Sequence, residues 1–149
     1  GSLDAIARLN HHGYTVVVAT NQSGLARKLF NLDTLALIHE KMYDLVEKAG
    51  GQIDAVFYCP HGPDDGCSCR KPKPGMLLEI GQRYNVSLKD VWFIGDSVRD
   101  IESAVCAHAR PALVRTGKGV KAEKLLHGEG KDDVPVYDDL AAAVDAILQ

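Results

Sequence analysis

Two hydrophobic periods alternate along the chain. Apolar residues that recur every three or four positions are typical of amphipathic helices, and short unbroken β-branched runs are typical of strands buried on both faces. The pattern predicts helices at 3–11, 33–49, 75–84, 100–107, 120–126 and 139–148. It predicts strands at 14–19, 53–58, 91–94, 112–114 and 134–137. This alternation favours an α/β, Rossmann-like fold with an open, mostly parallel sheet and helices on both faces.

Polar segments follow four of the predicted strands, at 20–24, 59–73, 95–97 and 116–119. In open parallel sheets, ligands bind beyond the carboxyl ends of the strands. We therefore expect the four loops to meet at one rim and to form a binding site there.

The second of these loops carries four potential metal ligands within eleven consecutive residues: Cys59, His61, Cys67 and Cys69. Zinc prefers thiolate and imidazole ligands, and a site filled by four protein ligands is structural. The alternative interpretation is a set of ordinary reduced cysteines beside an exposed histidine. A disulfide framework is disfavoured, because one residue separates Cys67 from Cys69 and the chain is no small cysteine-dense scaffold. The remaining cysteine, Cys106, is expected to be a buried apolar residue on a helix.

Two other loops contain residues suited to phosphoryl chemistry. Asp96 is expected at a strand tip, where a carboxylate can hold Mg²⁺, and Asp100 one helical turn later could orient the site from behind. The alternative is that both are helix N-terminal acids stabilised by the helix dipole. The Thr20 hydroxyl can donate to a phosphoryl oxygen, and the Lys71 ammonium can neutralise charge that develops on a transferring phosphoryl group.

Composition limits the classes of partner. The 149 residues are enough for one domain spanning 1–149, with 46% hydrophobic and 25% charged residues. The net charge of −3 provides no positive field to gather nucleic acid. No apolar run approaches the roughly 18–20 residues of a membrane helix. We expect a monomeric, cytoplasmic domain that acts on a small molecule, with neither nucleic acid nor membrane as a partner.

The order Thr20, Lys71, Asp96, each after its own strand, resembles the haloacid dehalogenase (HAD) superfamily of phosphatases. Segments 20–27, 59–77 and 115–119 narrow this resemblance to the heptose 1,7-bisphosphate phosphatase family, over nearly the whole chain. The resemblance implies a zinc loop in place of a cap domain. It also implies Mg²⁺-dependent removal of the C7 phosphate of D-glycero-D-manno-heptose 1,7-bisphosphate, a step toward lipopolysaccharide cores.

The resemblance also implies roles for individual residues. Thr20 and Lys71 would stabilise the phosphoryl group, and Asp96 would bind Mg²⁺. Structural zinc would be bound by Cys59, His61, Cys67 and Cys69. The phosphorylated sugar would be contacted by Thr20, Asn21, Gln22, Ser23, Arg70 and Lys71.

One departure from the superfamily concerns the nucleophile. Members attack phosphorus with the first aspartate of an Asp-x-Asp motif on an opening strand, which forms an aspartyl-phosphate, and the second aspartate moves the proton. The chain contains no Asp-x-Asp. We therefore expect a strand to be absent between the Thr20 and Asp96 strands, the sequence to be part of a longer protein, and residues 1–149 alone to be inactive. At two other positions, Lys28 and Ser97, this chain has a different residue from the one in the family pattern. Both positions concern the substrate pocket.

Two other functions stay open. The short zinc loop, with five residues between His61 and Cys67, is also similar to that of histidinol-phosphate phosphatases. The additional cations Arg70 and Lys118 favour a substrate with a second phosphate group over histidinol phosphate or another small phosphomonoester. The absent nucleophile is also consistent with a non-catalytic, zinc-stabilised phosphosugar-binding module.

Overall fold

The structure is a computed structural model that describes residues 1–21, 32–59, 66–131 and 133–149. Helices and strands alternate along these residues, as the sequence predicts. The elements are α1 Ser2–His11, β1 Val17–Asn21, α2 Leu32–Lys48, β2 Ala55–Cys59, α3 Gly75–Tyr84, η1 Leu88–Asp90, β3 Trp92–Gly95, α4 Val98–Cys106, β4 Arg110–Val114, α5 Gly119–Gly128, β5 Val136–Tyr137 and α6 Leu140–Ile147. The 3₁₀ turn η1 was not among the predicted elements.

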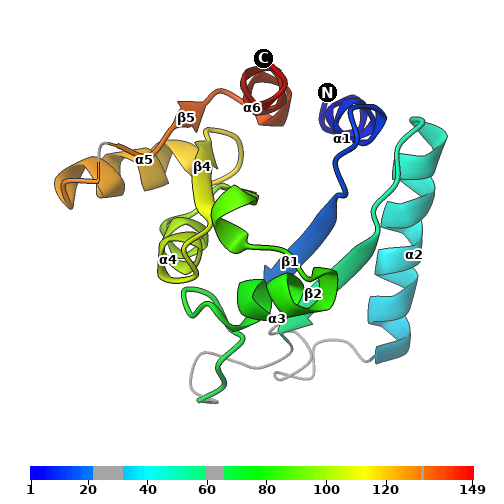
Figure 1. The fold of residues 1–149 in the computed structure, drawn as a ribbon, viewed down its shortest axis with the longest axis horizontal. Coiled ribbons are helices and arrows are strands. Elements are labelled where there is room, and N and C mark those ends of the chain that lie inside the picture. Colours follow the sequence, from blue (N-terminus) through cyan, green and yellow to red (C-terminus); the bar gives the residue numbers. More distant parts are fainter. Residues whose placement is uncertain (22–31, 60–65, 132) are drawn as a thin grey trace.

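The strands form two parallel sheets. One pairs β1 with β2, with Thr20 opposite Tyr58 and Asn21 opposite Cys59, and the other has the order β3-β4-β5. The parallel direction confirms the prediction. Among the described residues β1 and β3 do not pair with each other, and the sheet is interrupted at the place where the sequence analysis expects a strand to be absent. Figure 1 shows β1 and β2 beside α2, and β4 and β5 across the molecule from them. Strands β1 and β3 are consequently half-buried rather than buried on both faces.

Helices α3 and α4 join the two sheets. Phe57 from β2 lies in the same buried cluster as Ala104 of α4, and the half-buried Phe93 of β3 packs against it. The other buried members are Leu77, Ile80, Ala107 and Ala109. Because this cluster takes residues from both sheets, it sets the position of the β1 tip relative to the β3 tip.

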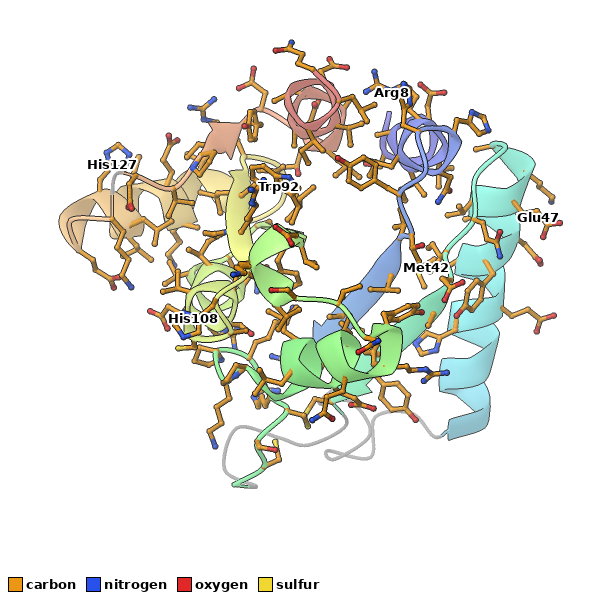
Figure 2. The ribbon with its side chains drawn as sticks, in the orientation of Figure 1. Arg8, Met42, Glu47, Trp92, His108 and His127 are labelled. Carbon is orange, nitrogen blue, oxygen red and sulfur yellow. The ribbon has the colours of Figure 1, made fainter. Side chains whose placement is uncertain are left out.

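Strand β1 begins later than predicted. The backbone N–H of Tyr14 donates to Leu9 O at 3.0 Å, and Gly13 has a φ of +88°. Tyr14 therefore closes the turn after α1 and is 42% exposed, instead of opening the strand. Helix α1 packs against α6, where Arg8 (labelled in Figure 2) donates to Asp145 Oδ1 at 2.5 Å and to Ala141 O at 3.2 Å.

The prediction for Cys106 was wrong. Its side chain is exposed at the end of α4, because the core face of that helix is formed by Ile101, Ser103 and Ala104. In the part of the chain that the structure describes, no helix combines the length and the apolar character needed to cross a membrane.

Candidate active site

Lys71 and Asp100 form an ion pair at the centre of the rim. Lys71 Nζ donates to Asp100 Oδ1 at 2.6 Å, and the two side chains are only 13% and 9% exposed. The ammonium also donates to the backbone carbonyl of Ala19 in β1 at 3.3 Å and lies 5.8 Å from the centre of the Phe93 ring. One side chain therefore contacts β1, β3 and α4.

The Asn21 side chain holds the backbone of Lys71 at the end of β1. Lys71 N donates to Asn21 Oδ1 at 3.1 Å, and Asn21 Nδ2 donates to Lys71 O at 3.4 Å. Strand β1 is thereby tied to the segment that follows β2. The preceding residue, Thr20, lies at the same strand tip, with its hydroxyl 3.4 Å from Asn21 O.

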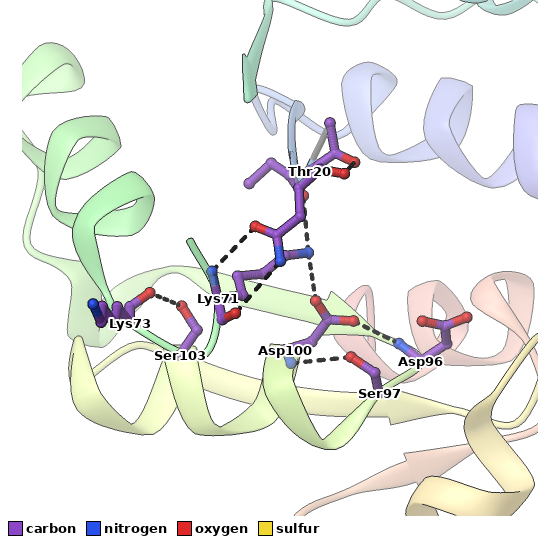
Figure 3. Close-up of polar contacts among 9 residues, drawn as sticks. Thr20, Lys71, Lys73, Asp96, Ser97, Asp100 and Ser103 are labelled. Carbon is purple, nitrogen blue, oxygen red and sulfur yellow. Dashed lines mark hydrogen bonds and ion pairs between the residues drawn. The ribbon is translucent and has the colours of Figure 1, made fainter. Parts of the chain in front are cut away.

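The β3 loop supplies two carboxylates with different partners (Figure 3). Asp100 Oδ2 accepts from the Asp96 backbone N–H at 3.1 Å, and Ser97 Oγ caps α4 by accepting from Asp100 N at 3.1 Å. The Asp96 carboxylate instead accepts from the Lys118 backbone N–H at 3.3 Å. Asp100 thus contacts both Lys71 and the β3 loop, which is the position expected for a supporting acid, while Asp96 faces the β4 loop.

Hydrogen bonds and an ion pair therefore link all four polar loops in series. Asn21 joins the first loop to the second, Lys71–Asp100 joins the second to the third, and Asp96 joins the third to the fourth. The convergence of these loops on one rim is confirmed for their described residues.

Glycine is required where the β3 loop turns into α4. A Cβ built on Gly95 would lie 2.4 Å from Asp100 Cβ and 2.5 Å from Asp100 Oδ2. Contacts below 3.0 Å force a shift, so a side chain at 95 would displace the Lys71 partner.

Three cysteines gather beside the rim. The sulfurs of Cys59, Cys67 and Cys69 lie within 4.8 Å of one another, and Cys59 Sγ is 3.4 Å from Cys67 Sγ. A tetrahedral zinc ion with Zn–S bonds of about 2.3 Å would place its sulfur ligands about 3.8 Å apart. The cluster is therefore of suitable size for zinc, whereas the predicted fourth ligand, His61, lies outside the described residues.

The electrostatic state of the cluster also suits a soft cation. Burial raises the pKa of Cys67, but hydrogen bonds from the Arg70 backbone N–H and from the neighbouring thiols outweigh it and lower the pKa to about 6. Burial, followed by hydrogen bonds and charge interactions with the other two cysteines, raises the pKa of Cys69 to about 12. The lowered pKa of Cys67 favours its thiolate form, which is the form that binds a soft cation.

Lys73 connects the cysteine segment to α4. Its Nζ donates to Cys67 O at 2.7 Å, and its carbonyl accepts from Ser103 Oγ at 3.0 Å. Ser103 is 1% exposed and was missed from the sequence. A hydroxyl on the apolar face of an amphipathic helix was the only available signal.

Other predicted residues take different positions. Gln22 and Ser23 lie outside the described residues. Arg70 lies in the turn before Lys73, with its carbonyl accepting from Lys73 N at 2.9 Å. Arg115, in the loop after β4, pairs with Glu123 Oε1 at 3.0 Å and Asp138 Oδ1 at 2.7 Å. These partners raise the pKa of Arg115, and Arg115 lowers the pKa of Glu123.

Comparisons with known proteins show which family the chain is similar to. A family model described as HAD-hydrolase-like matches residues 68–143. The D-glycero-β-D-manno-heptose-1,7-bisphosphate 7-phosphatase of Pseudomonas aeruginosa is 51% identical over 148 residues, which cover 99% of this chain and 82% of the relative. The protein of that name from Bordetella bronchiseptica is 52% identical over a match that covers 100% of this chain and 82% of the relative.

A crystal structure supports the same relationship. It is that of D,D-heptose 1,7-bisphosphate phosphatase from B. bronchiseptica complexed with magnesium and phosphate, with a TM-score of 0.94 and 52% identity. The match covers 100% of this chain and 82% of that one. The chain belongs to the D-glycero-β-D-manno-heptose-1,7-bisphosphate 7-phosphatase family of HAD-like hydrolases.

Proposed function

We propose that the protein hydrolyses the C7 phosphate of D-glycero-β-D-manno-heptose 1,7-bisphosphate in a Mg²⁺-dependent reaction. The observation that carries this proposal is the largely buried Lys71–Asp100 pair, which holds an ammonium against the Ala19 carbonyl of β1 while the Asp100 carboxylate also accepts from the Asp96 backbone N–H. A fixed cation next to a carboxylate is suited to stabilising a phosphoryl group and its metal ion. The names of the relatives indicate the substrate.

Each rim residue has a distinct role in this proposal. Thr20 and Lys71 stabilise the phosphoryl group, and the loop residues Asn21, Gln22, Ser23 and Arg70 contact the substrate. Asp96 fits a hard cation, because in the described residues its Oδ1 has no hydrogen-bond partner while Lys118 N–H holds Oδ2. When bound, Mg²⁺ would polarise the phosphoryl oxygens.

We further propose that the nucleophilic aspartate lies outside residues 1–149, on a strand that inserts between β1 and β3. Among the described residues, β1 pairs only with β2 and β3 only with β4, so each strand keeps one edge that could accept a parallel neighbour. Unpaired backbone at the centre of a sheet is costly, so a strand there would stabilise both halves. Residues 1–149 by themselves are then expected not to turn over substrate.

The substrate is tested by comparing turnover of the β and α anomers of heptose 1,7-bisphosphate with that of histidinol phosphate. The intact protein is expected to act fastest on a heptose bisphosphate and to release the C7 phosphate. A preference for histidinol phosphate would support the second candidate. Binding of the sugar without phosphate release by the intact protein would instead support the phosphosugar-binding module.

We propose that Cys59, His61, Cys67 and Cys69 hold a structural zinc ion that fixes the segment carrying Arg70 and Lys71. The proximity of the three sulfurs and the thiolate character of Cys67 support it. Lys73 extends this support to α4 through its bonds to Cys67 O and Ser103 Oγ. Zinc would therefore act on the Lys71 position and not on the reacting atoms.

Replacing Cys67 with Ser is expected to abolish zinc retention, because a hydroxyl is a poor substitute for thiolate. Elemental analysis of the purified variant should show a zinc content near zero, and turnover of the intact enzyme should fall. The matched control is Cys106→Ser, which removes an exposed cysteine outside the cluster and should leave zinc unchanged. Full zinc content in Cys67→Ser, or none in the wild type, would contradict the site.

Zinc affinity is also expected to depend on pH. The ion must displace the proton of Cys69, whose pKa is raised to about 12, so affinity should rise by at least about tenfold per pH unit near neutrality. Below about pH 6, Cys67 also becomes protonated and the dependence should steepen. Competition with a chelator over pH 5 to 8 would measure this, and a flat profile would exclude thiol ligation.

A further inference from the structure

The turn that follows β4 contacts the Asp96 carboxylate closely. The Lys118 backbone N–H donates to Asp96 Oδ2 at 3.3 Å, and a Cβ built on Gly117 would lie 2.3 Å from the same oxygen. Gly117 also has a φ of +57°, a conformation in which residues with side chains are strained. The backbone conformation therefore favours glycine at 117, and a side chain there would push the Asp96 carboxylate aside.

The turn has little freedom to move away from Asp96. Gly119 N donates to Thr116 O at 2.9 Å, and a Cβ on Gly119 would meet Val114 O at 1.8 Å. On the other side, Arg115 N donates to Tyr137 O at 2.9 Å and its guanidinium binds both Glu123 oxygens at 3.0 and 3.1 Å. A side chain at 117 would consequently displace the Asp96 carboxylate more easily than the turn.

We propose that Gly117 is a positioning residue for the magnesium ligand. The turn holds Asp96 Oδ2 through the Lys118 N–H, so Oδ1 would be the oxygen that holds a bound Mg²⁺, with little further loss of side-chain freedom. Groups that orient a metal ligand in this way typically contribute 10–100-fold in metal affinity. The inference rests on the proposed role of Asp96 in the phosphatase reaction.

The test compares Gly117→Ala with Gly130→Ala in the intact protein. Gly130 has a φ of +75° but nothing within 4 Å of an added Cβ, so alanine there reproduces the backbone strain without the contact. Calorimetric titration with Mg²⁺ alone should show a Kd raised about tenfold or more by Gly117→Ala and unchanged by Gly130→Ala. Both variants should unfold at a lower temperature.

A kinetic measurement separates positioning from general damage. In Gly117→Ala, the Mg²⁺ concentration needed for half-maximal turnover should rise while kcat at saturating Mg²⁺ stays within about twofold of wild type. A wild-type Kd for Mg²⁺ in Gly117→Ala would overturn the inference and leave the proposed function intact. No Mg²⁺ binding by the wild type would overturn both.

A measurement on the unchanged protein covers the case in which Gly117→Ala does not fold. Because the Lys118 N–H is bonded to the carboxylate that would share its charge with the metal, its NMR amide resonance should move during a Mg²⁺ titration. The midpoint should equal the calorimetric Kd. If the protein binds Mg²⁺ but the Lys118 amide resonance does not move, the proposed positioning of Asp96 by this turn would be refuted.

Discussion

Replacing Asp96 with Asn in the intact enzyme is expected to lower Mg²⁺-dependent turnover by about a thousandfold or more. Within residues 1–21, 32–59, 66–131 and 133–149, Asp96 Oδ1 accepts no hydrogen bond, while Asp100 is already bonded to Lys71 and to Asp96 N. An amide keeps the shape of the side chain but removes the anionic charge. The loss of metal-dependent charge stabilisation corresponds to several kcal/mol in the barrier.

The control for Asp96→Asn is Asp90→Asn, which removes the same charge from an exposed site in η1, just before β3. The control should keep wild-type turnover and Mg²⁺ dependence. Unfolding temperatures of the two variants would show that neither effect is a loss of fold. Turnover by Asp96→Asn within about tenfold of wild type would mean that another group holds the metal.

Asp100→Asn is expected to cause the second large loss, in both stability and activity. It leaves the Lys71 ammonium, in a side chain that is 13% exposed, without its counter-charge. Removing one partner of a buried ion pair typically costs about 3–5 kcal/mol, which for a chain of this size lowers the Tm by about 6–20 °C. The unpaired ammonium should also move away from the phosphoryl position, so turnover falls.

Two further variants separate these effects. Lys71→Met combined with Asp100→Asn removes both charges and should recover most of the stability but none of the activity. Asp145→Asn breaks the exposed Arg8–Asp145 pair, whose side chains are 36% and 60% exposed, and should cost less than about 1 kcal/mol. Equal stability losses for Asp100→Asn and Asp145→Asn in urea unfolding would contradict a special role for the buried pair.

Local rules were sufficient for helix α3. Its predicted range of 75–84 matches Gly75–Tyr84, because both ends have local causes. A Cβ at Gly75 would meet Ser68 O at 2.2 Å, and Asn85 ends the helix in the left-handed conformation with a φ of +51°. The start of β1 was predicted too early. The apolar run at 14–19 does not reveal that the backbone of Tyr14 is hydrogen-bonded to α1 and therefore cannot join the strand.

The candidate site was predictable by residue type but not by pairing. Thr20, Lys71 and Asp96 could be proposed because each follows a strand, and strand tips of parallel sheets share one edge. The partners were not predictable, because Lys71 and Asp100 are 29 positions apart and their contact depends on α3 and α4 packing between the sheets. The contacts of Ser103 with Lys73 and of Gly117 with Asp96 were not predictable for the same reason.

The sequence alone determined the α/β alternation, the rim on which the polar loops meet and the cysteine cluster, because hydrophobic period and ligand spacing are local properties. Only the tertiary structure decided that Asp100 pairs with Lys71, that Arg115 pairs with Glu123 and Asp138, and that Cys106 faces solvent. These outcomes depend on distances between distant segments, and packing of the core clusters, not sequence spacing, sets those distances.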